Sequence, residues 1–167
     1  MKQITILLSS QGQNAKVADA FNLELKKHNN ASSIIDLVSL DLPLYSGKEH
    51  KKNGIPKRVS NCIQLLNETD AFIFVAPEYN GGIPPVLSNF IAWISVSQKD
   101  WRGAFNNKPA VISSFSASCG HHMLSSLRTQ LSHIGMNVLG REITASFKKE
   151  LNLESVEHVC ASISGAQ

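Results

Sequence analysis

Cysteine is scarce in this chain, and its pattern excludes two common kinds of small protein. The three cysteines, Cys62, Cys119 and Cys160, are odd in number and widely spaced. No Cys-x-x-Cys pair occurs, so the sequence supports neither a disulfide framework nor a zinc site of the usual spacing. We expect all three thiols to be reduced.

Long hydrophobic runs and a strong excess of charge are also missing. No apolar run approaches the roughly 20 residues that cross a bilayer, and residues 1–4 lead into a short strand, not a secretory signal. The net charge is only +3, and the basic residues are dispersed outside 48–58, so nucleic-acid binding has little support. We therefore expect a cytoplasmic protein that binds neither membranes nor nucleic acid.

The remaining composition is that of a folded globular chain. Of its 167 residues, 43% are hydrophobic and 17% are charged. This length suits one domain with a real core and is short for two. We therefore expect residues 1–167 to form a single domain.

Short apolar segments alternate with helical patterns along the chain. Residues 4–8 form a continuous β-favouring run, as in a parallel strand that is covered on both faces. Such alternation predicts an α/β fold with three layers and a doubly wound parallel five-stranded sheet of order 2-1-3-4-5. We expect strands at 4–8, 32–37, 71–76, 110–115 and 137–139, helices around 17–25, 57–67, 85–96, 121–134 and 151–163, and a loop at 42–56.

The loop that follows the first strand suits a phosphate group. Residues 9–14 are small and polar and lead into a helix whose positive end carries free backbone N–H groups. The alternative is a helix cap without a ligand. The candidate phosphate-binding residues are Ser9, Gln11, Gln13 and Asn14.

The loop that follows the third strand combines stiff and flexible positions around an acid, an aromatic residue and an amide. Pro77 cannot donate a backbone hydrogen bond, and Gly81-Gly82 allows positive φ and close approach to a flat ligand. A loop with no ligand is the alternative. The candidate ligand-binding residues are Pro77, Glu78, Tyr79, Asn80 and Gly81.

The segment Pro77-Glu78-Tyr79-Asn80-Gly81, with Ile83-Pro84, Leu87, Asn89 and Trp93, resembles the signature of the NAD(P)H-dependent FMN reductase family. This flavodoxin-like group includes chromate, azo and quinone reductases, and the similarity runs from Ile4 to about Val138. The resemblance implies a non-covalent FMN whose ring meets the 77–81 segment, with NADPH or NADH as cosubstrate. In relatives, the loop after the fourth strand faces the pyrimidine edge of the flavin. Here that loop offers Ser116, Ser118, Cys119 and Gly120.

Two basic features bear on phosphate binding. Many family members carry an arginine in the first loop, which here is shorter and has none; Lys16 either substitutes for it or is solvated. The basic segment 48–52 is either a solvated surface or a contact for the phosphates of NADPH.

The expected helix 85–96 has more apolar side chains than one buried stripe holds. In the similar family this helix lies in a dimer interface, so we expect a homodimer, or a tetramer, formed through it. Trp93 is then a packing residue.

No residue is singled out as catalytic. His121 and His122 diverge on a helix and have no third ligand, and Cys119 has no assigned base, so we expect no metal and no nucleophile. Hydride transfer to a flavin needs neither. The resemblance therefore implies an oxidoreductase that passes electrons from a nicotinamide to a small acceptor: a quinone, azo or nitro compound, chromate or free flavin. The alternatives are a flavodoxin-type electron carrier and a binding module that kept the fold without FMN.

Overall fold

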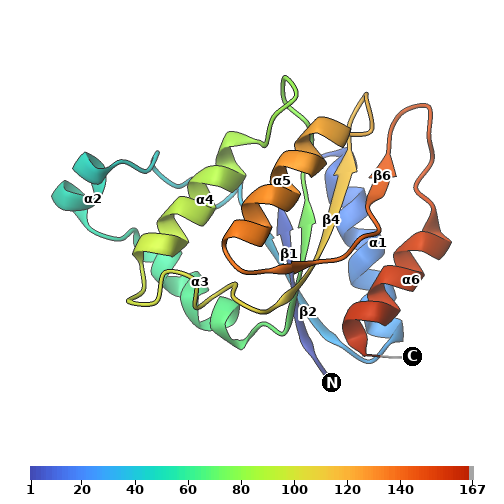
Figure 1. Ribbon diagram of the computed structural model, residues 1–167, viewed down its shortest axis with the longest axis horizontal. Helices are drawn as coiled ribbons and strands as arrows, with labels where there is room; N and C mark the ends of the chain where they lie inside the picture. The colour runs from blue at the N-terminus through green and yellow to red at the C-terminus, as the bar shows by residue number, and fades with distance from the viewer. Residues whose placement is uncertain (166–167) are drawn as a thin grey trace.

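The computed structural model describes residues 1–165, which form one parallel sheet between two layers of helices (Figure 1). The strands are β1 (Gln3–Leu8), β2 (Ala31–Asp36), β3 (Ala71–Val75), β4 (Pro109–Phe115), β5 (Asn137–Val138) and β6 (Ile143–Ala145). The sheet order is β2-β1-β3-β4-β5, with β6 also paired to β4. This confirms the predicted flavodoxin-like order.

Two short strands share the last position of the sheet. β5 pairs with the beginning of β4, at Pro109 and Ala110, and β6 pairs with its end, at Ser113–Phe115. The sequence predicts β5 but not β6, because three residues are too few to show a strand pattern. β6 brings the segment that follows it to the same edge as the end of β4.

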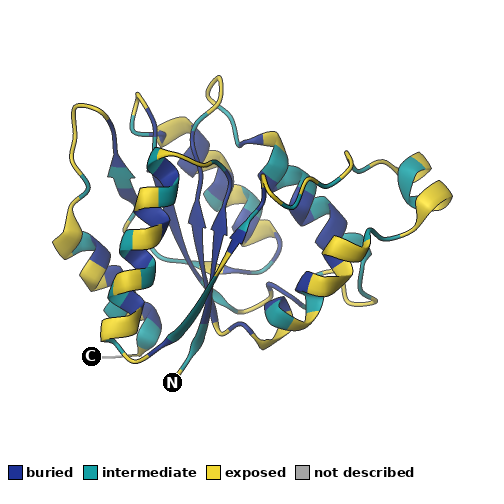
Figure 2. Ribbon diagram, turned by 180° about the vertical axis from the view of Figure 1, so that it is seen from behind, coloured by how far each residue is buried: buried dark blue, intermediate teal, exposed yellow. Residues whose placement is uncertain are grey.

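The helices cover both faces of the sheet. α1 (Gln13–Lys27) and α6 (Leu153–Ser164) pack on one face, and α3 (Lys57–Glu68), α4 (Pro85–Val96) and α5 (His121–His133) on the other (Figure 1). Alternate strand residues enter the two cores, since successive side chains point to opposite faces. Thus Ile6 packs with the α1 layer and Leu7 with the α4 layer. The central strands β1, β3 and β4 are the most buried elements (Figure 2).

The expected loop 42–56 contains a short helix, α2 (Gly47–Asn53). Ser46 caps its beginning by accepting a hydrogen bond from the Glu49 N–H at 3.0 Å, and Gly54, with φ of 73°, follows its end. α2 projects from the molecule with its outer surface exposed (Figures 1 and 2). It has no buried residue, so the sequence lacks the apolar stripe that marks a helix.

Other segments of the same chain cover most of the apolar side chains of α4. Trp93 is fully buried, and its ring Nε1 donates to the Pro43 carbonyl at 2.8 Å. The ring of Tyr45 meets that of Trp93 edge-on, with centroids 5.1 Å apart. The packing role of Trp93 is confirmed. The predicted homodimer therefore no longer follows from an uncovered α4.

The loops that follow β1, β3 and β4 lie at one edge of the sheet, opposite the chain termini (Figure 1). This arrangement follows from parallel pairing throughout the sheet. Within residues 1–165, no helix has the length and apolar character needed to cross a membrane.

Candidate functional site

The first loop leads into the positive end of α1 without supplying a side-chain cap. Gly12, with φ of 71°, is the residue before α1; no side chain caps this end among the described residues, and the first turn has no acid. The Ser9 N–H donates to the Val75 carbonyl at 2.9 Å. The Ser9 hydroxyl is buried and has no hydrogen-bond partner within residues 1–165. An anion would satisfy both the hydroxyl and the helix N–H groups.

Asn14 joins the first loop to the third. Its Nδ2 donates to the Phe115 carbonyl at 3.0 Å and to Ser10 Oγ at 3.1 Å, and its Oδ1 accepts from the Phe115 N–H at 2.9 Å. The side chain is 4% exposed. Because its polar atoms are engaged within the protein, Asn14 has only its backbone N–H to offer a phosphate.

Gln11 joins the first loop to the end of β2. Its Nε2 donates to Asp36 Oδ2 at 2.9 Å and lies 3.4 Å from Ser39 Oγ. Burial would raise the pKa of the Asp36 carboxyl, but the hydrogen bonds from Gln11 and Ser39 outweigh it and lower the pKa. Gln11 must release Asp36 before its amide can donate to a ligand, whereas Gln13 lies half-buried at the first position of α1.

The second loop makes a tight turn at Tyr79–Gly82. The Tyr79 N–H donates to the Gly82 carbonyl at 3.1 Å, and the Gly82 N–H donates back at 2.9 Å. Positive φ occurs at Asn80 (51°) and Gly81 (76°), as in a type I′ turn. The turn is therefore one residue earlier than Gly81-Gly82. Tyr79 is 50% exposed on this turn, and Pro77 is buried below it.

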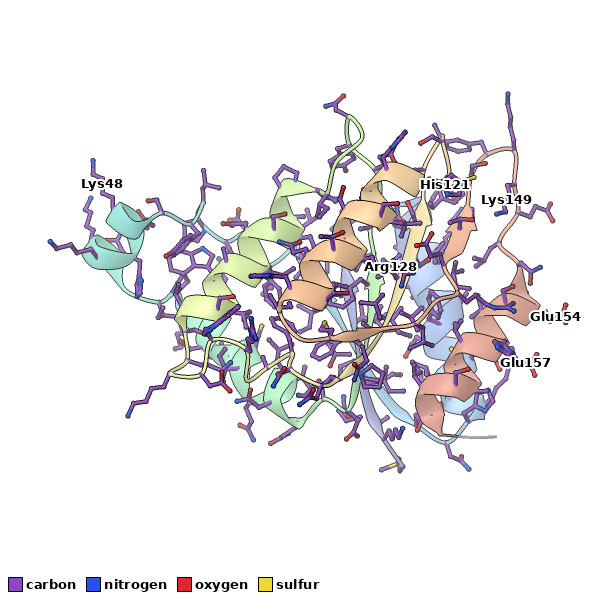
Figure 3. All side chains as sticks on the ribbon, in the orientation of Figure 1. Lys48, His121, Arg128, Lys149, Glu154 and Glu157 are labelled. Atoms are coloured by element: carbon purple, nitrogen blue, oxygen red, sulfur yellow. The ribbon has the colours of Figure 1, made fainter. Side chains whose placement is uncertain are left out.

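Glu78 binds the second loop to the third. Its Oε1 accepts from the Ser118 hydroxyl at 2.8 Å, and its Oε2 accepts from the N–H groups of His122 and Met123, each at 3.1 Å. The carboxylate thus caps the positive end of α5. Figure 3 labels His121, the first residue of α5, at the edge of the molecule that carries the loops.

The hydrogen bonds keep Glu78 ionised. Burial alone would raise the pKa of this carboxyl, but the donors on Met123, Ser118 and His122 stabilise the carboxylate and hold the pKa below its ordinary value. The positive end of α5 is therefore already neutralised by a protein carboxylate. Of α1 and α5, only α1 has an uncapped positive end at this edge of the sheet.

The third loop is fixed by a pair of hydroxyls and a glycine. Ser116 Oγ lies 2.8 Å from Ser114 Oγ and accepts from the Glu78 N–H at 2.7 Å. Cys119 and Gly120 have φ of 63° and 75°. A Cβ on Gly120 would lie 2.3 Å from Ser114 Oγ, so only glycine fits this position.

These contacts bring the three predicted loops together. Asn14 links the first loop to the third, and Glu78 links the second to the third. The sequence analysis missed two partners in these links, Phe115 and the start of α5, and it also missed the contact of Ser114 with Ser116. A polar residue within three positions after each of these strands (Ser9, Glu78 and Ser116) was the available signal, but it does not tell a ligand-binding side chain from one that holds the loop.

Comparison with known proteins identifies the family. A family model described as NADPH-dependent FMN reductase matches residues 3–150. An uncharacterized protein of Mycoplasma pneumoniae is 26% identical over 145 residues, which are 83% of this chain and 84% of that protein. The NAD(P)H-dependent FMN reductase LOT6 of Saccharomyces cerevisiae is 29% identical over 118 residues. That match covers 64% of this chain but only 56% of the yeast protein.

A solved structure shares the fold over nearly the whole length. FerB of Paracoccus denitrificans, a flavoenzyme described as an NAD(P)H:(acceptor) oxidoreductase, superposes with a TM-score of 0.81. The match covers 99% of this chain and 96% of FerB at 16% sequence identity. At that identity the likeness shows the fold alone.

Proposed function

The chain belongs to the NADPH-dependent FMN reductase family, and from this we propose that it is an FMN-containing enzyme that passes electrons from NADPH or NADH to a small acceptor. One observation carries the proposal. Three loops are tied together at the carboxyl edge of the sheet, yet the positive end of α1 has no cap and the buried Ser9 hydroxyl has no partner within the described chain. Ligands of open α/β sheets bind at this edge.

The residues present fit the phosphate of FMN. The Ser9 hydroxyl and the backbone N–H groups of Gln13 and Asn14 would hold it, with the α1 dipole favouring its negative charge. The exposed Lys16, in the first turn, is the nearest basic residue in the sequence to this end and takes the place of the missing arginine. The Gln11 amide would join only after leaving Asp36.

The ring of FMN would lie against the second and third loops. Backbone atoms of residues 77–81 would meet the ring, and the N–H groups of Ser118 and Gly120 would face its pyrimidine edge. The Cys119 N–H already donates to the Ser116 carbonyl at 3.0 Å. When bound, FMN supplies the chemistry, because it accepts a hydride from the nicotinamide and reduces the acceptor. The protein's own task is to hold the two loops rigid, which the Glu78 carboxylate does through Ser118, His122 and Met123.

The acceptor is an oxidised small molecule, such as a quinone, an azo or nitro compound, chromate or free flavin. The lysines of α2 are exposed, and Lys48 lies at the outer end of the projecting segment (Figure 3). They would meet the phosphates of NADPH if this segment folds toward the loops. A homodimer through α4 remains part of the proposal, based on the family resemblance.

A flavodoxin-type electron carrier is the second candidate, favoured only by the shared fold. Such carriers are usually strongly acidic, so that they meet basic redox partners, whereas this chain has a net charge of +3. The reductase is therefore preferred.

A steady-state assay tests the proposal. The purified chain is reconstituted with FMN, and the oxidation of NADPH and NADH is followed with a panel of quinone, azo, nitro, chromate and flavin acceptors. We expect turnover with at least one acceptor. FMN binding without any nicotinamide oxidation would favour the electron carrier, and a chain that binds no flavin would be a binding module.

A further inference from the structure

A hollow lies next to the end of β4, on the face of the sheet covered by α1 and α6. Its volume is about 360 Å³, which is within the range of small-molecule sites. Residues of α1 form one side, among them Gln13 and Val17, and the segment after β6 forms the other. Gln13 and Lys16 also belong to the candidate phosphate site, whereas Phe115, Phe147 and the other lining residues do not.

Two aromatic rings form the most specific part of this hollow. The ring of Phe115, at the end of β4, and that of Phe147 meet edge-on, with centroids 5.1 Å apart and planes at 86°. Phe147 is 80% exposed, although a phenyl ring of this size normally seeks burial. Both rings line the hollow.

Phe147 is held in place by an ordered turn. The Ser146 N–H donates to the Lys149 carbonyl at 2.8 Å, and the Lys149 N–H donates back at 3.2 Å. The ammonium of Lys149 also donates to Thr144 Oγ1 at 2.7 Å. The turn is anchored to the third loop, because the Ser116 N–H donates to the Ala145 carbonyl at 3.2 Å. Figure 3 labels Lys149 on this segment, toward the edge that carries the loops.

The charges around the hollow are balanced. Its lining has one cation, Lys16, and one anion, Glu150, and both are exposed. Their opposite charges leave no net preference for an ion of either sign. Binding energy must therefore come from the apolar surface and the two rings.

We propose that this hollow is an accessory binding site for an uncharged planar aromatic compound. The ligand lies between α1 and the turn at Phe147, in contact with the Phe115 and Phe147 rings. The inference is independent of the proposed function, because neither ring takes part in holding FMN.

Binding of 2-naphthol to the full-length chain tests the inference. The ¹⁵N-labelled protein is titrated without FMN, and the amide shifts of Val17, Phe115, Ala145 and Phe147 are followed. We expect saturable shifts at these amides. Replacing Phe147 by serine should raise the Kd about tenfold or more, since an aromatic contact is lost. Phe147 is exposed, so the variant should stay folded.

Leu23→Ser is the matched control, because Leu23 is 63% exposed on α1 and lies outside the lining. Its Kd should equal that of the natural chain. Absence of shifts at the four amides, or equal Kd values for F147S and the natural chain, would overturn the inference. Tighter binding of the 2-naphthoate anion than of 2-naphthol would overturn the assignment to an uncharged ligand.

A repeat with saturating FMN separates this site from the candidate flavin site. We expect an unchanged Kd for 2-naphthol. Loss of 2-naphthol binding would make the hollow part of the flavin site and overturn the inference. A chain that binds 2-naphthol at Phe147 but binds no FMN would leave the inference standing and remove the proposed enzyme.

Discussion

Glu78 accepts hydrogen bonds from the Ser118 hydroxyl and from two N–H groups at the start of α5. The sequence analysis assigns Glu78 to the candidate ligand-binding segment 77–81. In the structure, its carboxylate instead binds hydrogen-bond donors of the protein. The partners are 40 to 45 residues away, and no local pattern links them. A capping acid is predictable when it lies beside its helix in sequence, and Glu78 does not.

The variant Glu78→Gln should be less stable than the natural chain at pH 7 by about 1 kcal/mol, as for the loss of a helix cap. The pKa of the folded-state carboxyl lies below its ordinary value, so the stabilisation is present above that value and is lost as the pH falls through the folded pKa. Urea unfolding of the variant and the natural chain at pH 7 and near pH 3 measures the stability difference and its loss at low pH. Glu157→Gln, on the exposed side of α6, is the control. A difference that persists unchanged at pH 3 would refute the electrostatic account.

Gly120 has a backbone conformation that other residues adopt at a cost, and Ser114 occupies the space beside it. Gly120→Ala should therefore lower the free energy of unfolding by at least about 2 kcal/mol. Gly140→Ala is the comparison, since a Cβ there meets no atom within 4 Å, and should change stability by less than about 0.5 kcal/mol. Thermal denaturation of both variants measures the two changes in stability. Equal losses of stability in the two variants would mean that the third loop tolerates a side chain at residue 120.

The helices and strands were predictable where a long apolar pattern existed. β1, β3 and β4 are continuous buried runs, and α5 has a regular stripe at Leu124, Leu127 and Leu131. α2 and β6 were missed, because one has no buried face and the other is only three residues long. Both are defined by their neighbours, namely Ser46 at the start of α2 and the end of β4 beside β6.

The segment 43–56 depends on α4 for its position. Trp93→Phe removes the hydrogen bond to the Pro43 carbonyl and part of the buried ring, and we expect a loss of about 2 kcal/mol. Proteolysis within 43–56 should become faster, because the segment loses an anchor. Trp101, which is 41% exposed, provides the control. Trp101→Phe should leave both the free energy of unfolding and the cleavage rate nearly unchanged. Equal cleavage rates in the two variants would show that the segment is held by other contacts.

The convergence of the three loops follows from the order of the whole sheet. Once strands run parallel in the order 2-1-3-4-5, the ends of β1, β3 and β4 must meet at one edge. The sequence therefore predicts correctly that the three candidate loops share one edge of the sheet. It does not tell which polar side chains face a ligand, because Asn14, Ser116 and Glu78 turn their polar atoms toward the protein.

The most direct measurement compares FMN with riboflavin, which lacks only the phosphate. The flavin-free chain is titrated with each compound, and quenching of flavin fluorescence gives the two Kd values. If the free end of α1 and the Ser9 hydroxyl hold a phosphate, FMN should bind about 100-fold more tightly than riboflavin. Equal Kd values, or binding of neither compound, would contradict the account.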